Sequence, residues 1–325
     1  MSRRAALVLA LAAALAAGAL WLGRALADRP DLSEFAAERL PPAGDGLRLT
    51  FLGVSTLLVS DGETAFLTDG FFTRPPLWRT VAWRVAPDPA AIDAALARAG
   101  IDRLAAVFVV HSHYDHAMDA PLVAERTGAL LVGSPSTAQI ARGLGFDEAR
   151  VRVPAPGEAF ELGRFRVSPI PTRHFPHGIA MGAIEAPLVP PVRASEYKEG
   201  GSYSIWIEHP RGSLLVQGSA GFVPGALDHV RADAVLLGIG GLGTRDERYR
   251  EEYWREVVEA SGARRVIPIH YDDFTRPLGD VPLAAPNLID DVAVGLRDLR
   301  ERARAGRDVR FAPAWEAVDP LAGLR

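Results

Sequence analysis

The sequence contains no cysteine and only one lysine, Lys198, among its 325 residues. Without cysteine the chain has no disulfides, thiolate zinc sites, iron–sulfur clusters or cysteine nucleophiles. A phosphate-binding P-loop needs a lysine followed by serine or threonine, and Lys198 is followed by glutamate, so this class of site is excluded. Metal chemistry must therefore depend on histidine, aspartate and glutamate, and the eight histidines are the residues to follow.

Strong charge is also absent. The net charge is −4, with 23% charged and 48% hydrophobic residues. This balance is typical of a folded chain rather than a disordered one. Because the basic residues do not cluster in an acidic background, we expect no nucleic-acid partner.

The first 27 residues have the pattern of a targeting segment. Arg3 and Arg4 precede an uninterrupted apolar run over residues 5–22, and Ala25-Leu26-Ala27 resembles a signal-peptidase site. The run is long for a signal peptide and just long enough to cross a bilayer. The pattern therefore predicts an exported, extracytoplasmic protein, with residues 1–27 either cleaved or retained as a membrane anchor.

The remaining chain is predicted to form one α/β domain. Residues 28–46 are polar and proline-rich and are expected to be a linker, and residues 47–325 to be the domain. Strands and helices alternate through much of it, which favours a layered α/β fold. Strands are expected at 47–59, 64–67, 105–110, 129–133, 202–208, 213–217, 233–237 and 265–269, with two or three more in 150–170. Helices are expected at 89–99, 119–127, 135–143, 246–260 and 288–304, and a loop at 71–88.

The segment His111-Ser112-His113-Tyr114-Asp115-His116 carries the strongest chemical signal. It follows a continuously apolar run, 105–110, expected to be a strand buried on both faces. Side chains two residues apart in an extended segment point the same way, so His111 and His113 can share a metal. The chain then turns and offers Asp115 and His116 to a neighbouring position. Imidazole and carboxylate are suitable zinc ligands.

This H-x-H-x-D-H motif after a hydrophobic strand resembles the signature of the metallo-β-lactamase-fold hydrolases. The resemblance extends over roughly residues 47–312. Segments 52–56 (LGVST) and 67–70 (LTDG) resemble the opening strands of the branch that contains the ascorbate-phosphate lactonases and the N-acyl-phosphatidylethanolamine phospholipases D. The resemblance implies an αββα sandwich, two mixed β-sheets flanked by helices.

The resemblance also implies the rest of a metal centre. His174 would join His111 and His113 in one site, and His270, which ends the segment VIPIH, would join Asp115 and His116 in a second. Asp69 would orient a ligand histidine rather than bind the metal. The expected cofactor is zinc, one or two ions, with manganese or iron as alternatives.

One position departs from the family pattern. Where the family has a bridging aspartate, this chain reads Gly218-Ser219-Ala220-Gly221. Serine is a weak neutral ligand and brings no negative charge to hold two cations close together. The consequences left open are a single metal, a site bridged only by hydroxide, or rescue by Asp272 or Asp273. We slightly favour a loop-capping role for these two aspartates.

The predicted function is a metal-dependent hydrolase in which a metal-bound hydroxide attacks an ester, lactone or phosphodiester. The expected substrate is a small molecule or a lipid-like compound. Asp115 would act as ligand and catalytic carboxylate, and His177 and Tyr271 are candidates to protonate the leaving group, with a structural role for each left open. The alternatives are a non-catalytic metal-binding envelope protein of the same fold and a mononuclear hydrolase.

Three further segments have open assignments. Residues 238–243 match G-x-G-x-x-G, but they lie late in the chain and outside an early βαβ unit, so we interpret them as a tight loop near the metal site. The aromatic and arginine-rich segment 71–88 would either line a pocket mouth for an anionic or acyl substrate or be a half-buried loop. The irregular segment 175–200 would be a lid, an edge-covering loop or a membrane-contacting surface.

Overall fold

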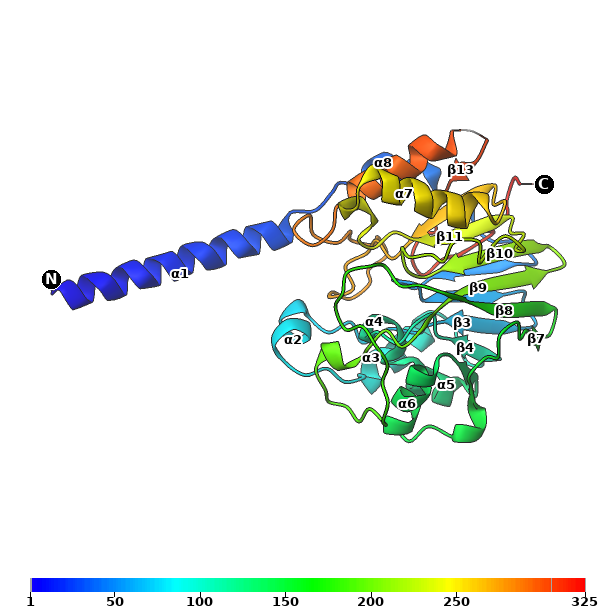
Figure 1. Cartoon of the computed structure of the whole chain (residues 1–325), viewed down its shortest axis with the longest axis horizontal. Helices are drawn as coiled ribbons and strands as arrows, with labels where there is room; N and C mark the ends of the chain where they lie inside the picture. The colour runs from blue at the N-terminus through cyan, green and yellow to red at the C-terminus, as the bar shows by residue number, and fades with distance from the viewer. Residues whose placement is uncertain (1, 305, 325) are drawn as a thin grey trace.

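The computed structural model describes residues 2–304 and 306–324 and contains two β-sheets packed face to face, with helices on both outer faces (Figure 1). In the described residues the first sheet has the order β14-β1-β2-β3-β4-β5-β6 and the second β13-β12-β11-β10-β9-β8-β7. In each sheet an antiparallel half, β1–β3 or β7–β10, continues into a parallel half, β3–β6 or β10–β13. The predicted αββα sandwich of two mixed sheets is confirmed.

The strands of the first sheet are β1 (Arg48–Phe51), β2 (Leu57–Ser60), β3 (Ala65–Thr68), β4 (Ala106–Phe108), β5 (Leu130–Val132), β6 (Val151–Arg152) and β14 (Ala317–Val318). Those of the second are β7 (Phe160–Leu162), β8 (Phe165–Thr172), β9 (Ser202–His209), β10 (Gly212–Gln217), β11 (Ala234–Gly238), β12 (Arg265–Ile269) and β13 (Asp308–Val309).

The helices divide between the two outer faces. Helices α3 (Pro89–Arg98), α5 (Ala120–Thr127) and α6 (Pro135–Gly143) lie on the side of the first sheet, and α7 (Glu247–Tyr253) and α8 (Val292–Ala303) on the side of the second (Figure 1). A π-helical segment, η5 (Trp254–Glu259), continues α7. The shorter elements are α2 (Leu77–Ala82), α4 (Tyr114–Ala117), η1 (Ser33–Glu38), η2 (Glu148–Arg150), η3 (Ala194–Glu196) and η4 (Leu242–Thr244).

Phenylalanine side chains join the two sheets. Phe66 of β3 packs edge-on against Phe165 of β8, with ring centroids 5.2 Å apart, and Phe108 of β4 packs against Phe160 of β7 at 5.5 Å. Such edge-to-face pairs stabilise a core by about 0.5–1.5 kcal/mol beyond their burial. Val107 of β4 points the other way, into a second apolar cluster beneath α3 and α5. Strand β4 is therefore buried on both faces, as its apolar run predicts.

The predicted strand 47–59 is instead a hairpin of β1 and β2. A tight turn separates them, in which the Leu52 N–H donates to the Thr56 carbonyl (2.9 Å) and the Thr56 N–H to that of Gly53 (2.8 Å). Gly53 lies at φ +93°, a region open to glycine at little cost. The prediction of one strand was wrong because an unbroken apolar run does not show where the chain reverses.

Two segments predicted to be irregular are ordered differently. Within the expected loop 71–88, α2 begins after Pro76, a residue suited to the start of a helix. Within the expected linker 28–46, Phe35 and Leu40 are buried against the domain, and Leu40 N–H donates to the Phe311 carbonyl at 2.9 Å. These two apolar side chains fix a segment whose average composition is polar.

The N-terminal helix α1 (Arg3–Ala27) extends away from the domain (Figure 1). Its most apolar window has a mean hydropathy of 2.3 and none of it is buried. Its length and composition are sufficient to cross a membrane. A signal sequence meets the same criteria of length and hydropathy. Whether residues 1–27 are cleaved or retained stays a prediction.

Candidate metal centre

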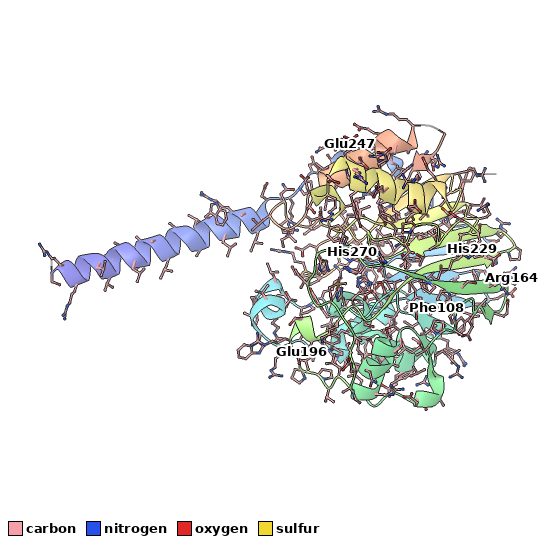
Figure 2. All side chains as sticks on the ribbon, in the orientation of Figure 1. Phe108, Arg164, Glu196, His229, Glu247 and His270 are labelled. Carbon is pink, nitrogen blue, oxygen red and sulfur yellow. The ribbon has the colours of Figure 1, made fainter. Side chains whose placement is uncertain are left out.

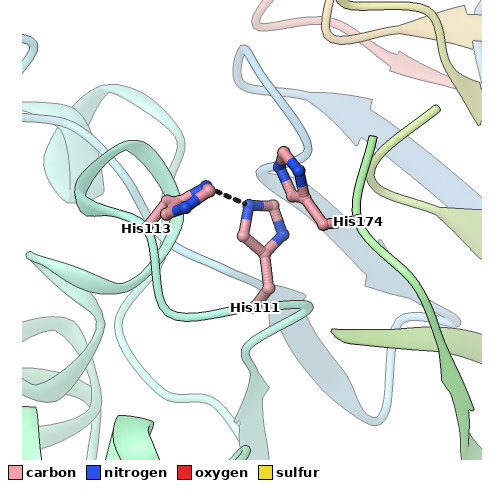
Figure 3. Close-up of side chains that lie close together, drawn as sticks. All are labelled: His111, His113 and His174. Atoms are coloured by element: carbon pink, nitrogen blue, oxygen red, sulfur yellow. Dashed lines mark hydrogen bonds between the residues drawn. The ribbon is translucent and has the colours of Figure 1, made fainter. Parts of the chain in front are cut away.

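Six of the predicted ligands form two adjacent groups of three. His111, His113 and His174 make up the first group (Figure 3), which we call the first trio, and Asp115, His116 and His270 the second trio. Within each group the ligand atoms lie within 4.8 Å of one another. The rings of His111 and His116, one from each trio, have centroids 3.8 Å apart, so the two trios form one centre.

Strand ends from both sheets position these side chains. His111 and His113 follow β4, and His113 is the N-cap of the one-turn helix α4, which carries Asp115 and His116. His174 follows β8 of the second sheet, and His270 follows β12 and lies in the middle of the molecule between the layers (Figure 2). Loops at the carboxyl ends of strands commonly form ligand sites in α/β folds.

Backbone carbonyls orient two histidines of the first trio. His111 Nε2 lies 3.1 Å from His113 Nδ1, and the His174 ring centroid lies 4.5 Å from that of His111 (Figure 3). His113 Nε2–H donates to the Ala180 carbonyl at 3.2 Å, and His174 Nδ1–H to that of Phe175 at 2.7 Å. Each bond fixes the tautomer and leaves the other nitrogen, His113 Nδ1 or His174 Nε2, free to bind a metal.

Asp69 orients one histidine of the second trio. His116 Nε2 lies 3.2 Å from His270 Nε2, and Asp115 Oδ2 lies 3.4 Å from both nitrogens. On the other side of the ring, His116 Nδ1–H donates to Asp69 Oδ2 at 2.8 Å. Asp69 also accepts the Ser55 hydroxyl (2.5 Å) and the Val110 N–H (2.9 Å). The structure thus places Asp69 behind a ligand histidine, in the position expected of an orienting carboxylate.

Burial and neighbouring charges together set the protonation of the centre. Desolvation and neighbouring imidazoles lower the pKa of His111 well below its usual value, and desolvation lowers that of His113 to about 4. Burial by itself raises the pKa of Asp115, but His116 and His270 outweigh it and hold that pKa below the usual range. The opposite balance holds at His270, where Asp115 outweighs burial and raises the pKa. Metal binding requires neutral imidazole and ionised carboxylate, so His111, His113 and Asp115 are already in the binding form, whereas His270 must give up a proton when a metal binds.

The donor set fits a divalent transition metal. Five imidazole nitrogens and a carboxylate, without sulfur, suit zinc and also iron or manganese. Each trio supplies three protein ligands, which is the number that a catalytic zinc site uses while it keeps a further position open. The residues present therefore fit one metal ion in each trio.

The centre opens into a cavity of about 540 Å³. Ligands from both trios line it, among them His113, His174 and His270. Its remaining walls are largely apolar and include Phe175, Ile179, Phe274 and Ile289. A substrate in this cavity therefore meets the metal ligands and an apolar surface together.

The sequence model of the beta-lactamase superfamily domain matches residues 64–271, which is more than half of the chain and contains both trios. The chain belongs to the beta-lactamase superfamily. It is 27% identical to a UPF0173 metal-dependent hydrolase of Heliobacterium modesticaldum over 246 residues, which cover 70% of this chain and 84% of the relative.

Solved structures show the same superfamily fold. A protein of Veillonella parvula, described as a possible metal-dependent hydrolase, has a TM-score of 0.51 at 14% identity and covers 85% of this chain and 99% of its own. CmlA, a diiron beta-hydroxylase of Streptomyces venezuelae, has a TM-score of 0.52 at 14% identity and covers 83% of this chain and 53% of its own. At this identity the likeness extends to the fold alone. The resemblance based on the H-x-H-x-D-H motif is confirmed at the level of the superfamily.

His177, one candidate acid, lines the metal cavity beside His174. Its ring centroid is 4.7 Å from that of His174. The Ile179 N–H donates to His177 Nδ1 at 2.8 Å, so the ring proton is on Nε2. Desolvation lowers the pKa of His177, so at neutral pH the side chain is an uncharged N–H donor.

Tyr271, the other candidate acid, does not line the cavity. It is buried between the layers, where its ring stacks on Phe51 at a centroid distance of 5.9 Å. Desolvation raises its pKa, which opposes proton exchange. The role of acid does not fit this position, because the backbone turns at His270 (φ +56°) and the Tyr271 ring packs with Phe51 and Phe311 in the core.

Asp272 and Asp273 do not supply the missing bridge. Asp272 forms an ion pair with Arg74 and accepts the Val54 N–H at 2.8 Å, while Asp273 accepts Arg29 Nη2 at 2.7 Å and the Thr275 N–H at 2.9 Å. Both carboxylates are engaged in bonds to neighbouring segments of the chain. This agrees with the loop-capping role that we slightly favour from the sequence.

Ser219 holds the loop that carries His174. Its hydroxyl accepts the Phe175 N–H at 2.9 Å, and its carbonyl accepts Gln217 Nε2 at 3.0 Å. Gly221 lies so near the backbone of this loop that a Cβ at position 221 would be 2.3 Å from the Arg173 carbonyl oxygen. The serine therefore lies against the ligand loop, at the edge of the cavity, but carries no charge.

We expect Ser219→Asp to increase metal occupancy. The carboxylate keeps an acceptor for the Phe175 N–H and adds negative charge to the wall of the cavity that both trios border, which favours a second cation. Metal content by mass spectrometry after dialysis against a limiting chelator should rise toward two per chain. The neutral isostere Ser219→Asn is the control, and an equal content in wild type, Ser219→Asp and Ser219→Asn would show that the absent charge does not limit occupancy.

Contacts at the centre also come from residues that the motif does not identify. The Ala180 carbonyl belongs to segment 175–200, whose first residues line the cavity. The end of the segment is joined to the motif by the Ser112 N–H, which donates to the Glu199 carbonyl at 2.9 Å. Gly240, from the loop 238–243, leaves room for His270, because a Cβ there would be 2.7 Å from His270 Nδ1. The sequence gives no indication of which backbone carbonyl will contact a ligand, whereas the glycine pattern of residues 238–243 did indicate a tight loop near the metal site.

Proposed function

We propose that the chain is a metal-dependent hydrolase, with zinc in one or both trios, that cleaves an ester, lactone or phosphodiester of a small molecule with an apolar portion. The observation that carries the proposal is that both ligand trios and the Nε2–H of His177 border one apolar-walled cavity. The name of the Heliobacterium relative, a metal-dependent hydrolase, supports the reaction class.

A metal ion held by these trios would supply the activation of water and the polarisation of the bond under attack. The chain's own residues do the rest. Carbonyl and carboxylate partners hold the trios in position, which avoids reorganisation during the reaction. The apolar walls exclude bulk water from the reacting group and strengthen the electrostatic interactions there.

His177 is assigned to the leaving group. Its Nδ1 is occupied by the Ile179 N–H, so the ring presents Nε2–H as its donor. An alkoxide leaving group has a high pKa and needs a proton or a hydrogen bond as the bond breaks, whereas a nitrophenolate does not. The contribution of His177 should therefore grow with the pKa of the leaving group.

We expect His177→Ala to lower kcat about 10²-fold on an alkyl ester and only slightly on the matching p-nitrophenyl ester, because one donor to developing charge contributes on this order. His177→Gln, which keeps an N–H donor, should recover part of the loss. Steady-state kinetics on the ester pair and metal content measure both points. Equal losses on the two esters, or loss of metal, would contradict the assignment to the leaving group.

A further inference from the structure

Exposed apolar side chains lie on three segments that border the metal cavity. Trp78, Val81 and Trp83, on and directly after α2, are 60%, 74% and 64% exposed. Ile179 is 66% exposed, and Leu288 and Ile289 are 50% and 46% exposed. We call these six residues the apolar collar. Each of its three segments also contributes a residue to the cavity lining, namely Thr80, Ile179 or Ile289, so the collar lies on segments that border the cavity.

The C-terminal end of α1 is fixed to one of these segments. The Asn287 N–H donates to the Asp28 carbonyl at 3.0 Å, and Asn287 Nδ2 to the Asp28 carboxylate at 3.1 Å. Arg29 Nη2 donates to Asp273 Oδ2 at 2.7 Å, and Arg29 also bonds the Ala284 carbonyl. Residue 28 directly follows α1, so no flexible spacer separates the helix from the collar residue Leu288. In Figure 1, α1 and α2 lie on the same side of the domain.

The dimensions and chemistry of α1 match a bilayer. Its 25 residues span about 37 Å at 1.5 Å per residue, enough for a hydrocarbon core of about 30 Å. Trp21 and Arg24 lie near the end that meets the collar, where aromatic and basic residues favour the headgroup region. Because the helix leaves the domain at the collar, a membrane that holds α1 begins at the level of Asp28 and Asn287.

Basic side chains next to the collar fit the same surface. Arg79, Arg84 and Arg193 line a hollow of about 650 Å³ beside α2, with Asp88 as the one carboxylate among its lining residues in the described chain. Asp88 is engaged by the Ala90 N–H at the start of α3. Basic groups flanking apolar ones are the composition that binds anionic lipid surfaces.

We propose that the apolar collar docks on the lipid bilayer in which α1 is retained as an anchor, so that the mouth of the metal cavity faces the membrane. The two features support one another, since the anchor brings the collar to the surface and the collar removes exposed apolar area from water. This orientation is independent of the reaction that the centre performs.

The absence of cysteine allows a direct test in the full chain. Single cysteines are introduced by Trp78→Cys, Leu288→Cys and, as control, His229→Cys, and are labelled with an environment-sensitive NBD fluorophore. His229 is exposed, lies beside Trp206 of β9, and is on the side of the domain opposite α1 (Figure 2). Each chain is reconstituted into vesicles of phosphatidylcholine and phosphatidylglycerol, with or without lipid carrying a doxyl quencher on its acyl chain.

Insertion of the collar at the acyl boundary predicts a blue shift at positions 78 and 288 and loss of about half their emission to the quencher. The label at 229 should stay unshifted and unquenched. The proposal is overturned if the chain floats with vesicles but label 78 is unquenched, or if intact mass shows that cells produce a chain beginning at Asp28 that does not bind vesicles. A blue shift without lipid that accompanies dimer formation would assign the collar to a second copy and also overturn it.

Discussion

Replacing His113 with alanine is expected to empty the first trio and to lower hydrolysis by at least about 10³-fold, because the cation supplies several kcal/mol of transition-state stabilisation and each 1.4 kcal/mol is a factor of ten. The substitution leaves two ligands, His111 and His174, and also removes the donor to the Ala180 carbonyl that fixes segment 175–200 above the centre. Metal analysis, turnover of generic ester and phosphodiester substrates, and thermal unfolding with and without added zinc measure the effect.

The unfolding measurement separates a lost metal from a lost fold. Wild type should gain stability with zinc, because a ligand that binds only the folded state stabilises it. His113→Ala should lose most of this gain while the chelated protein remains folded. The matched control is His229→Ala, an exposed histidine on the opposite side of the domain (Figure 2). The proposed hydrolase function would be contradicted if the wild-type chain binds metal, is inert to every substrate and is no more stable than His113→Ala. That result would favour a non-catalytic metal-binding protein.

Substituting Asp69 by asparagine is expected to weaken metal binding and activity by about 10–100-fold, the usual effect of removing a carboxylate that orients a metal-binding histidine. Asp69 accepts from His116 Nδ1, the Ser55 hydroxyl and the Val110 N–H, and all four groups are buried. Asparagine has one acceptor oxygen and an NH₂ group, so at least one buried donor loses its partner. That loss should lower the free energy of unfolding of the metal-free chain by about 1–3 kcal/mol.

A second buried aspartate provides the control for Asp69. Asp61 lies 3.4 Å from His209 Nε2 and forms an ion pair with Arg164, which Figure 2 places on the side of the domain opposite α1. Asp61→Asn should also reduce stability in urea but leave the zinc dissociation constant, measured by chelator competition, unchanged. If both substitutions weaken zinc binding equally, the effect of Asp69 is general destabilisation and not orientation of His116.

The residues of the metal centre were predictable because their information is local. Three histidines and an aspartate within six residues, directly after a strand buried on both faces, have few other uses, and the order of His174 and His270 along the chain followed the superfamily resemblance. The fold class was predictable for the same reason, since the opening strands and the alternation of strands with helices are patterns of neighbouring residues.

Contacts between distant residues were not predictable in this way. Tyr271 and His270 are neighbours in sequence, yet one packs in the core and the other borders the cavity. Phe35 and Leu40 bury a segment that its composition describes as a linker. In each case the deciding interaction is with a residue more than 200 positions away, Phe51 for Tyr271 and Phe311 for Phe35 and Leu40.

The sequence by itself determined the superfamily, and it predicted the six candidate metal ligands and the serine, Ser219, at the position of the family's bridging carboxylate. Only the tertiary structure decided how the ligands are oriented, that His177 rather than Tyr271 borders the cavity, and that α1 ends beside a segment that borders that cavity. The physical reason is that ligand identity follows from side-chain chemistry and short spacing. Orientation depends on hydrogen bonds to groups such as the Ala180 carbonyl, whose position is set by packing of the whole chain.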